Sequence, residues 1–395
     1  MLIASIKKSP ETMPSCVDAV ELRLDLNPSL RSLIPLVKKP LILKTRDTED
    51  LKYKPAYFDC DWQDRPIRKG GLICSRHIDH TPSDLLQTFA ELMEAMPADI
   101  YKLATMAHST LDALRMLIAT RTLRAQGKNV IGLCMGEFGQ ITRIVSEHTY
   151  AYLGTPTAPG QLSVDELTSI YRYPRQEEKW YGLIGDPVEQ SPSHITHNEH
   201  CLFLKMLIKK DELSEFFTLV KQLPFHGLAV TIPHKEAIDP GKVINTLLKK
   251  DKGWQSFNTD GQGVLDVLGP LENKRIALLG AGGAAKGIAL ALEGMDLAIY
   301  NRTPKTVCGQ ATQSLNCIAP YDILINATSC GMLSEDCPLS FDCILPHTTV
   351  FETICKPEET TLVKYAKAKQ CRVHYGKELF RAQAKRQFDI WFANK

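Results

Sequence analysis

The sequence lacks the features that would place the protein in a membrane, outside the cell or on a nucleic acid. No apolar run approaches the roughly 20 residues that span a bilayer. Residues 1–10 contain neither an apolar signal core nor a small-residue cleavage site. The net charge is only +2, and the short basic runs are mixed with acids rather than arranged as a stripe. We therefore expect a cytoplasmic protein with small-molecule ligands, without nucleic-acid or membrane partners.

Paired cysteines are also missing. The twelve cysteines are scattered singly, without a CxxC pair and without histidines at metal-ligand spacing. This distribution excludes a disulfide framework and predicts free thiols in a reducing compartment. We expect no metal site.

The first half instead contains short apolar runs rich in β-branched residues, several of them separated by helical patterns at residues 82–96 and 108–126. This alternation predicts a compact (β/α)8 barrel. Eight βα units normally take about 200 residues or more, but this half ends near Pro174. At least one outer helix should therefore be missing, most simply at residues 63–70. The expected strands are residues 2–6, 17–25, 40–46, 57–62, 71–77, 99–106, 129–136 and 150–156.

Charged residues within these strands share one face. Glu21, Arg23 and Asp25 alternate with leucines, and Lys44 continues the pattern in the third expected strand. Because the outer face of a barrel packs against helices, the charged face should point inward. Several inward charges would be costly unless they formed a polar site. Lys102, inside the apolar strand 100–104, belongs to the same pattern.

A lysine in an enclosed polar site suits imine chemistry. Burial and neighbouring cations lower the pKa of the amine and leave a nucleophilic fraction. An imine acidifies the adjacent carbon, so a nearby histidine can remove that proton and later protonate a leaving hydroxyl. Lys102 is the candidate nucleophile and His77, which ends the fifth expected strand, is the candidate acid and base.

Roughly the first 170 residues resemble type I 3-dehydroquinate dehydratase. The matching pieces are ELRLD at 21–25, SRH at 75–77, ADIYK at 98–102, GQITR at 139–143 and TAPGQ at 157–161. The resemblance implies that Lys102 is the Schiff-base lysine and that His77 is the general acid and base. It also implies a substrate-binding set for the hydroxyls and the carboxylate: Glu21, Arg23, Arg46, Met135, Arg143, Thr157 and Gln161.

The chain departs from this family at two places. The glutamate that usually follows the matched arginine by four residues is Asp50 here, with Glu49 beside it. We expect Asp50 to orient His77, with Glu49 as the alternative. The segment 75–81 is one residue short, so His80 remains a rival to His77.

The second half contains a strand, a glycine turn and a helix in direct succession. Residues 275–279 are apolar, and Gly280, Gly282 and Ala285 form a G-x-G-x-x-A turn before a helical run. The glycines allow a pyrophosphate to approach the helix N-terminus. This context predicts a dinucleotide-binding Rossmann lobe.

The end of the next expected strand, 296–301, selects between the two nicotinamide cofactors. NAD sites place a carboxylate there for the ribose 2′-hydroxyl. This chain has Asn301, Arg302 and Thr303 instead. Because arginine suits a 2′-phosphate, we predict NADP.

Residues from Trp180 onward resemble shikimate dehydrogenase. The matching pieces are GDPVEQSPS at 185–193, VTIPHK at 230–235, INT at 244–246, FNTD at 257–260 and INATSCGM at 325–332. The resemblance implies that Lys235 and Asp260 form the catalytic pair, and that Ser191, Ser193, Thr231, Asn245 and Gln383 hold the substrate. The implied cofactor contacts are Gly280, Gly282, Gly283, Ala284, Ala285, Asn301, Arg302, Thr303, Thr328 and Gly376.

The two resemblances predict a chain that dehydrates 3-dehydroquinate to 3-dehydroshikimate and then reduces this product to shikimate with NADPH. The expected domains are a barrel at 1–174, a linker at 175–179, a substrate lobe at 180–270 with 378–395, and an NADP-binding lobe at 271–377. A monomer is slightly favoured. Ala229, His194 and Cys355 depart from the dehydrogenase pattern. Two alternatives remain open, a catabolic quinate/shikimate dehydrogenase and a non-catalytic metabolite sensor.

Overall fold

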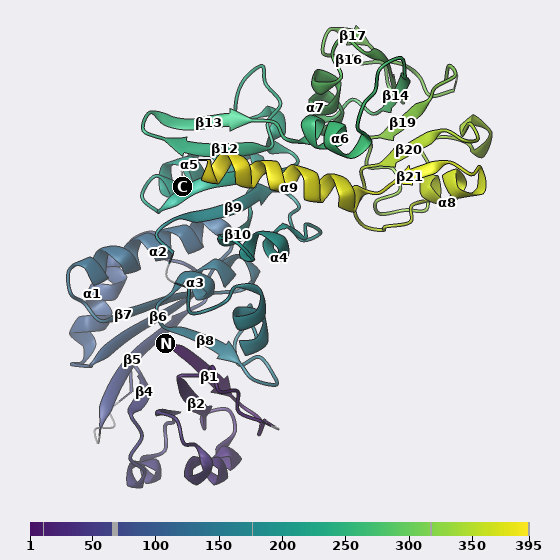
Figure 1. Cartoon of the computed structure of the whole chain (residues 1–395). Helices are drawn as coiled ribbons and strands as arrows, with labels where there is room; N and C mark the ends of the chain where they lie inside the picture. Colours follow the sequence, from purple (N-terminus) through teal and green to yellow (C-terminus); the bar gives the residue numbers. More distant parts are fainter. Residues whose placement is uncertain (11, 65–69, 176, 317, 394–395) are drawn as a thin grey trace. The chain divides into compact units, whose positions relative to one another are not determined.

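The computed structural model describes residues 1–10, 12–64, 70–175, 177–316 and 318–393. The chain forms two compact units, Met1–Leu183 with His194–Phe225, and Ile184–Ser193 with His226–Lys395 (Figure 1). The first unit thus continues past the expected linker at 175–179 and includes a later segment. The four domain boundaries expected from the sequence stay a prediction.

The first unit contains a barrel sheet of eight strands, each paired in parallel with its neighbours. The hydrogen-bonded order is β7-β6-β5-β4-β3-β2-β1-β8. The end strands β7 and β8 are both contacted by the short helix α3 (Gln140–Val145). All eight strands lie where the sequence predicts them, so the barrel is confirmed. The strands are β1 (Leu2–Ile6), β2 (Ala19–Arg23), β3 (Leu41–Lys44), β4 (Tyr57–Asp61), β5 (Gly71–Ile78), β6 (Ile100–Met106), β7 (Val130–Met135) and β8 (Thr149–Tyr152).

The inward face of the barrel has an apolar layer followed by a polar layer. The apolar layer is a buried cluster formed by Ile3, Ala19, Ile42, Ile73, Ile100, Ile131, Leu133 and Tyr150, with Tyr57 packed against it. Because side chains alternate along a strand, the residue two positions later points the same way. In six strands that residue is polar: Ser5, Glu21, Lys44, Asp59, Ser75 and Lys102. The alternation of side chains therefore places a layer of polar residues directly above a layer of apolar residues inside the barrel.

Helices cover the barrel unevenly. Helix α1 (Leu85–Ala95) follows β5 and helix α2 (Thr110–Ala125) follows β6, both as predicted (Figure 1). After β2 and β3 the described chain forms 3-10 turns instead, η1 (Pro28–Leu36) and η2 (Thr48–Lys52). Pro35 inside η1 disfavours a regular α-helix there, because an internal proline removes a backbone hydrogen bond and clashes with the preceding turn. The expected missing helix at 63–70 falls partly on residues 65–69, outside the described residues.

Helix α2 also joins the barrel to the later segment of the first unit. That segment contains α5 (Leu213–Val220), which packs on α2. The Thr110 hydroxyl donates to the Leu207 carbonyl at 2.7 Å, and Arg115 pairs with Glu215 at 2.5 Å. The remaining elements of this segment are α4 (Ser193–Asn198), β10 (Leu202–Leu207) and η5 (Lys210–Glu212). Strand β9 (Trp180–Gly185) comes earlier in the chain and spans the end of the first stretch of this unit at Leu183.

The second unit begins with three antiparallel strands and a helix returning from the C-terminal end of the chain. Strands β11 (Phe225–Val230), β12 (Thr246–Lys250) and β13 (Gly253–Phe257) pair in that order. Helix α9 (Gly376–Phe392) lies along β12, where the Trp391 indole donates to the Leu247 carbonyl at 3.0 Å (Figure 1). Along the chain, η6 (His234–Glu236) follows β11 and α6 (Asp260–Leu268) follows β13.

The rest of the second unit is a parallel sheet in the order β18-β15-β14-β19-β20-β21. Counted along the chain this is 3-2-1-4-5-6, the Rossmann strand order, with the ligand crevice outside the first and fourth strands. The predicted Rossmann lobe is therefore confirmed. Its elements are β14 (Arg275–Leu279), α7 (Gly283–Ala291), β15 (Asp296–Asn301), the hairpin β16 (Thr306–Val307) and β17 (Gln310–Ala311), β18 (Gln313–Ser314), β19 (Ile323–Asn326), η7 (Phe341–Cys343), β20 (Thr349–Glu352), α8 (Thr361–Ala368) and β21 (Arg372–His374).

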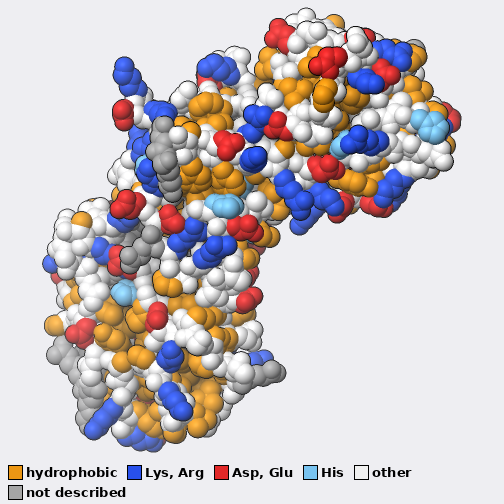
Figure 2. Space-filling view, viewed as in Figure 1, with side chains coloured by type: hydrophobic (Ala, Val, Ile, Leu, Met, Phe, Trp, Pro, Cys, Tyr) orange, Lys and Arg blue, Asp and Glu red, His pale blue; other side chains and the backbone are white. Residues whose placement is uncertain are grey.

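Acidic and basic side chains are interspersed over the face seen in Figure 2. No helix in the described part of the chain is both long enough and apolar enough to cross a bilayer. The described residues likewise contain no group of three or more histidine, cysteine and acidic side chains arranged to hold a metal ion.

Candidate active sites

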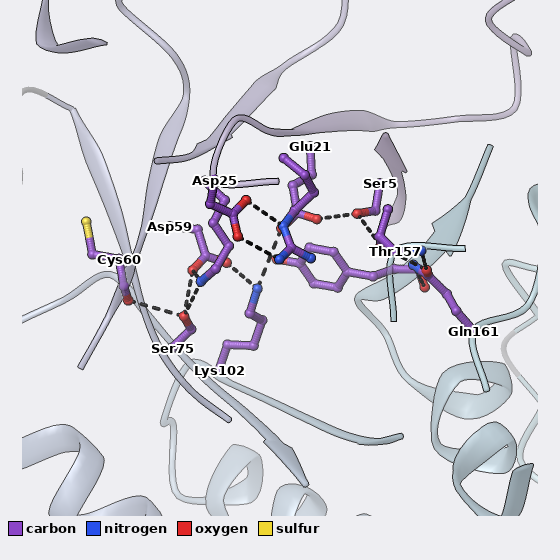
Figure 3. A network of polar contacts seen from close by, with 12 residues as sticks. Ser5, Glu21, Asp25, Asp59, Cys60, Ser75, Lys102, Thr157 and Gln161 are labelled. Atoms are coloured by element: carbon purple, nitrogen blue, oxygen red, sulfur yellow. Dashed lines mark hydrogen bonds and ion pairs between the residues drawn. The ribbon is translucent and has the colours of Figure 1, made fainter. Parts of the chain in front are cut away.

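Lys102 lies at the centre of the polar layer inside the barrel (Figure 3). It is 5% exposed, and its ammonium contacts the Asp59 carboxylate directly and lies 3.6 Å from Glu21 Oε1. The Tyr150 ring lies beneath Nζ, 4.4 Å from its centroid. The predicted imine lysine is thus buried among one aromatic ring and two carboxylates.

Asp59 is a site residue that the sequence reasoning missed. It is 1% exposed and accepts hydrogen bonds from Lys44 at 2.7 Å and from the Ser75 hydroxyl at 2.6 Å, in addition to Lys102. Burial by itself raises the pKa of Asp59, but Lys102 and Lys44 together outweigh burial and hold that pKa well below its usual range. The available signal was its place two residues after Tyr57, on the inward face of an expected strand.

A second polar chain crosses the barrel from Glu21 to Gln161 (Figure 3). Ser5 donates to Glu21 and lies 2.8 Å from the Thr157 hydroxyl. The Gln161 amide oxygen accepts from the Thr157 hydroxyl at 2.9 Å, and its amide nitrogen donates to the Tyr150 carbonyl at 3.0 Å. The structure therefore brings three of the predicted substrate-binding residues together on neighbouring strands and the loop after β8.

Arg143 on α3 is buried beside the same group. One of its guanidinium nitrogens donates to the Tyr150 carbonyl at 3.2 Å, while its Nε has no hydrogen-bond partner among the described residues. Burial lowers the pKa of Arg143 to about 10. A desolvated guanidinium with an unused donor is suited to an anionic ligand group.

His77 lies on β5, two residues beyond Ser75, so its ring points into the barrel mouth. The ring is open to solvent through the mouth, yet the surrounding walls desolvate it. This burial, and then the positive charges of Lys102 and Lys44, lower the pKa of His77 to about 3. The imidazole is therefore neutral at pH 7 and available as a base.

We expect the His77 ring to stay neutral as the pH falls from 7 to 5, because its pKa lies below that window rather than at the ordinary 6.5. A pH titration of ring nitrogens by NMR, with His77→Gln identifying the resonance, measures this directly. Lys102→Met removes the second-largest cause of the shift, so the His77 pKa should rise in that variant. A normal titration midpoint near 6.5 in the unaltered chain would contradict the electrostatic environment described above.

Other predicted barrel residues are not drawn into this group. Asp50 is fully buried, but its oxygens are held by Arg31 at 2.6 and 2.9 Å and by the Thr45 hydroxyl at 2.5 Å. Among the described residues no hydrogen bond joins Asp50 to His77. The Arg46 side chain is 76% exposed and lies 3.4 Å from Asp64.

The remaining barrel predictions lie at the mouth or outside it. Arg23 forms a bidentate pair with Asp25 at 2.8 and 2.7 Å, and Met135 ends β7 half-buried. The rival histidine, His80, is exposed beside Asp79 at 2.9 Å, as a solvated loop residue would be. Glu49 is exposed on η2.

In the second unit, Lys235 and Asp260 form the predicted ion pair. Lys235 follows β11 on the short turn η6, and Asp260 begins α6. The lysine ammonium contacts one Asp260 oxygen, and the Asn245 amide donates to the other at 2.8 Å. Asn245 thus holds the Asp260 carboxylate in place, and the carboxylate in turn positions the Lys235 ammonium.

Two of the expected substrate residues, Asn245 and Gln383, belong to the hydrogen-bonded group behind Asp260. The Gln383 amide oxygen, on α9, lies 3.4 Å from the Thr259 hydroxyl, and Thr259 accepts from the Asn245 amide at 2.9 Å. Ser191 and Ser193 lie 2.8 Å apart through their hydroxyls, and Thr231 directly follows β11. Gln387 was missed: it is buried one turn after Gln383 and donates to the Asn245 carbonyl at 3.2 Å.

The departures from the dehydrogenase pattern have limited structural effect. Ala229 is buried in β11, where it pairs with Thr246 of β12. Burial raises the pKa of the Cys355 thiol to about 11, so this cysteine is not a thiolate at neutral pH. Within the described part of the chain, no hydrogen bond joins Ala229 or Cys355 to the Lys235–Asp260 pair.

The glycine turn lies at the Rossmann switch point and is shaped for a phosphate. Gly280 has φ +115°, and a Cβ there would meet the Ala327 carbonyl oxygen, which follows β19, at 2.9 Å. Gly282 faces open space, and a Cβ on Gly283 would lie 3.2 Å from Lys235 Cβ. The residues therefore fit a dinucleotide whose pyrophosphate lies on the α7 N-terminus, close to Lys235. Ala284 and Ala285 continue this turn into α7.

The other cofactor predictions lie at the ends of the neighbouring strands. Asn301 ends β15 and donates to the Thr303 carbonyl at 2.7 Å, which leaves Arg302 exposed at the tip of this turn. The Thr328 hydroxyl donates to Asn326 at 2.7 Å just after β19. Gly376 begins α9, where a Cβ would collide with the Ile354 carbonyl. These positions lie on the Rossmann half of the unit, as predicted.

Comparison with known proteins agrees with both halves. Residues 63–178 match the family model of type I 3-dehydroquinase. The shikimate biosynthesis protein AroDE of Chlamydia pneumoniae is 32% identical over 95% of this chain and 90% of its own length. The chloroplastic bifunctional 3-dehydroquinate dehydratase/shikimate dehydrogenase of Arabidopsis thaliana is 30% identical over 81% of this chain and 62% of its own.

A solved structure resembles the second half of the chain. The shikimate 5-dehydrogenase of Thermus thermophilus, determined with NADP(H) and shikimate, is 26% identical with a TM-score of 0.50, over 54% of this chain and 93% of its own. The chain has one candidate site in each half, and its similarity to AroDE of Chlamydia pneumoniae extends over both halves. The chain belongs to the AroDE family of bifunctional enzymes, in which a type I 3-dehydroquinase barrel precedes a shikimate dehydrogenase.

Proposed function

We propose that the barrel dehydrates 3-dehydroquinate to 3-dehydroshikimate through Lys102 and His77, and that Lys235 and Asp260 support the reduction of that product to shikimate. The observation that carries the proposal is the occurrence of a lysine–aspartate pair in each half, one on the barrel's polar layer and one beside the glycine turn. NADP is the cofactor of this family's dehydrogenase half, as in the Nitrosopumilus maritimus relative named shikimate dehydrogenase (NADP(+)).

In the barrel, the neutral amine of Lys102 attacks the substrate ketone, and water leaves as the imine forms. The imine withdraws electrons from the adjacent carbon, and neutral His77 removes a proton there. The resulting electron pair forms a double bond to the next carbon, which is β to the imine, and expels the hydroxyl there. His77 returns the proton to this leaving hydroxyl, so that water leaves. Hydrolysis of the imine then frees Lys102. Arg143, with its unused donor, is our choice for the substrate carboxylate, and Thr157 and Gln161 for its hydroxyls.

In the second unit, NADPH supplies the hydride for the ketone carbon. Negative charge then develops on the ketone oxygen, where the Lys235 ammonium stabilises it and donates the proton. Asp260 holds that ammonium in place, and Asn245 holds Asp260. Ser191 and Ser193 are suited to the substrate carboxylate because their hydroxyls lie together and both can donate.

Arg302 should select NADPH over NADH. It is exposed at the end of β15, and among the described residues no hydrogen bond or ion pair occupies its guanidinium. Arg302→Ala should weaken NADPH binding roughly ten- to a hundred-fold, the range of a lost charge-assisted hydrogen bond. NADH affinity should barely change. Titration of both cofactors by fluorescence measures the ratio; equal weakening of both would make Arg302 a structural residue.

The direct test is shikimate formation from 3-dehydroquinate and NADPH by the purified chain alone. A catabolic quinate/shikimate dehydrogenase should prefer NAD and the oxidative direction, so the same assay with NAD and quinate separates the two. A metabolite sensor would bind the ligands without turnover. Absence of both half-reactions in a folded, ligand-binding chain would overturn the proposal.

We further infer a cytoplasmic enzyme that works as a monomer. None of the eleven described cysteines is in a disulfide with another described residue, a pattern typical of a reducing compartment. Sedimentation with and without substrates tests this.

A further inference from the structure

Two lysines share one buried carboxylate inside the barrel, and the dehydration mechanism uses only one of them. Lys44 donates to Asp59 Oδ1 at 2.7 Å, while Lys102 contacts Asp59 Oδ2. Lys44 also donates to the Ser75 hydroxyl at 2.8 Å, and its side chain is only 12% exposed. A buried lysine with both acceptors supplied by the protein has no evident role in holding substrate.

The strand register determines this arrangement. Lys44 of β3 is the direct partner of Asp59 of β4, and Ser75 of β5 is the direct partner of Lys102 of β6. Asp59 therefore lies between the two lysines in the order of the strands, with Ser75 beside it. No rearrangement of loops is needed to form the group, because all four residues are on the sheet itself.

We infer that Lys44 is a positioning residue of the dehydratase site that, by sharing Asp59, weakens the hold of this carboxylate on Lys102, whose amine must be released to form the imine. This inference rests on the imine role proposed above for Lys102. One buried carboxylate facing a single lysine would hold it as an ammonium, and an ammonium cannot attack a ketone. A second cation on the same carboxylate offsets this effect.

The groups that face Lys102 come from every side of the barrel mouth. The negative ones are Glu21 at 3.6 Å and Asp59 in direct contact. The positive ones are Lys44 across Asp59, Arg23 on β2, paired with Asp25, and Arg143 on α3. The uncharged ones are His77, whose pKa is lowered by burial and by both lysines, and the Tyr150 ring. Lys44 is the positive group bound to the same carboxylate as Lys102.

The sign of the effect follows directly. Replacing Lys44 by a neutral residue leaves Asp59 with Lys102 alone, so the ammonium form of Lys102 is stabilised. More alkaline pH is then needed to produce the amine. The acid limb of the pH profile, which is the pH range over which the rate of imine formation rises, therefore moves to higher pH. Removing the Asp59 charge has the opposite effect, since Lys102 loses its contacting counter-charge while Lys44 remains.

The experiment compares the rate of borohydride-trapped imine on Lys102 as a function of pH in the full-length chain with 3-dehydroquinate. Lys44→Met should move the acid limb up by about one pH unit, or about tenfold in trapping rate below the limb. Lys44→Arg keeps the charge and should leave the limb unmoved. Asp59→Asn should move the limb down. Lys38→Met, which removes an exposed lysine just before β3, is the matched control.

Each outcome is decisive. Dehydrogenase activity of the same chain and a thermal melt report folding. A limb that stays in place in folded Lys44→Met, or that moves equally in Lys44→Arg, overturns the inference. If Lys44→Met does not fold, the Asp59→Asn limb decides, and an upward or absent shift overturns it. If the unaltered chain forms no adduct on Lys102 at any pH, the proposed dehydratase mechanism itself fails, independently of Lys44.

Discussion

Lys102→Met should lose dehydration of 3-dehydroquinate by at least about 10⁴-fold, the scale seen when a covalent nucleophile is removed. Methionine keeps the length and apolar stem of the side chain but cannot form an imine. Because Lys102 lies in the first unit, reduction of 3-dehydroshikimate by the same chain should persist at its normal rate. The two half-reactions, each assayed with its own substrate, measure the separation.

Borohydride trapping identifies the nucleophile independently of turnover. Reduction in the presence of 3-dehydroquinate should add the ligand mass to the peptide containing Lys102, and this adduct should disappear in Lys102→Met. Lys44 is the internal comparison, because it lies on the same carboxylate but is engaged by Asp59 and Ser75. An adduct on Lys44 instead of Lys102 would show that the roles of the two lysines are reversed.

Lys235→Met should lower the turnover number for reduction of 3-dehydroshikimate by about 10²–10⁴-fold, the usual contribution of a positioned acid. The lysine stem packs against Gly283, so methionine preserves the shape beside the glycine turn. NADPH affinity and barrel activity should change little. Asp260→Asn should lower the turnover number as well, since the amide leaves the ammonium without its counter-charge.

The matched control is Lys242→Met, which removes a lysine of the same unit that is 66% exposed and paired with Asp239 on the surface. Its turnover should equal that of the unaltered chain. A Lys235→Met effect confined to the Michaelis constant would mean that the lysine binds substrate without serving as the acid.

The barrel site was predictable to the extent that it follows strand alternation. The inward face of Glu21 and Lys102 follows from period-two patterning, and each residue lies on the polar layer. Asp59 was missed because its own strand shows only an alternating acid, which is equally compatible with a solvated edge. Its importance comes from Lys44 on one neighbouring strand and Lys102 two strands away on the other side.

The placement of Asp50 shows what spacing within a loop leaves open, and its predicted role beside His77 stays a prediction. The four-residue spacing from Arg46 suggested a partner for His77, but η2 turns Asp50 toward Arg31, which comes from the loop after β2. A 3-10 turn in place of a barrel helix changes the direction of every side chain on it. Spacing within one loop could not reveal a partner supplied by another loop.

The sequence by itself determined the eight strands, the Rossmann turn, the absence of a carboxylate after β15 and the choice of Lys102 and Lys235 as candidates, because these depend on local alternation and on motifs within one element. Only the tertiary structure decided which charges meet: Asp59 between two lysines, Asp50 on Arg31, and Asn245 with Gln387 behind Asp260. The physical reason is that an ion pair inside a barrel depends on strand register and loop direction. Both are set by packing between segments far apart in the chain.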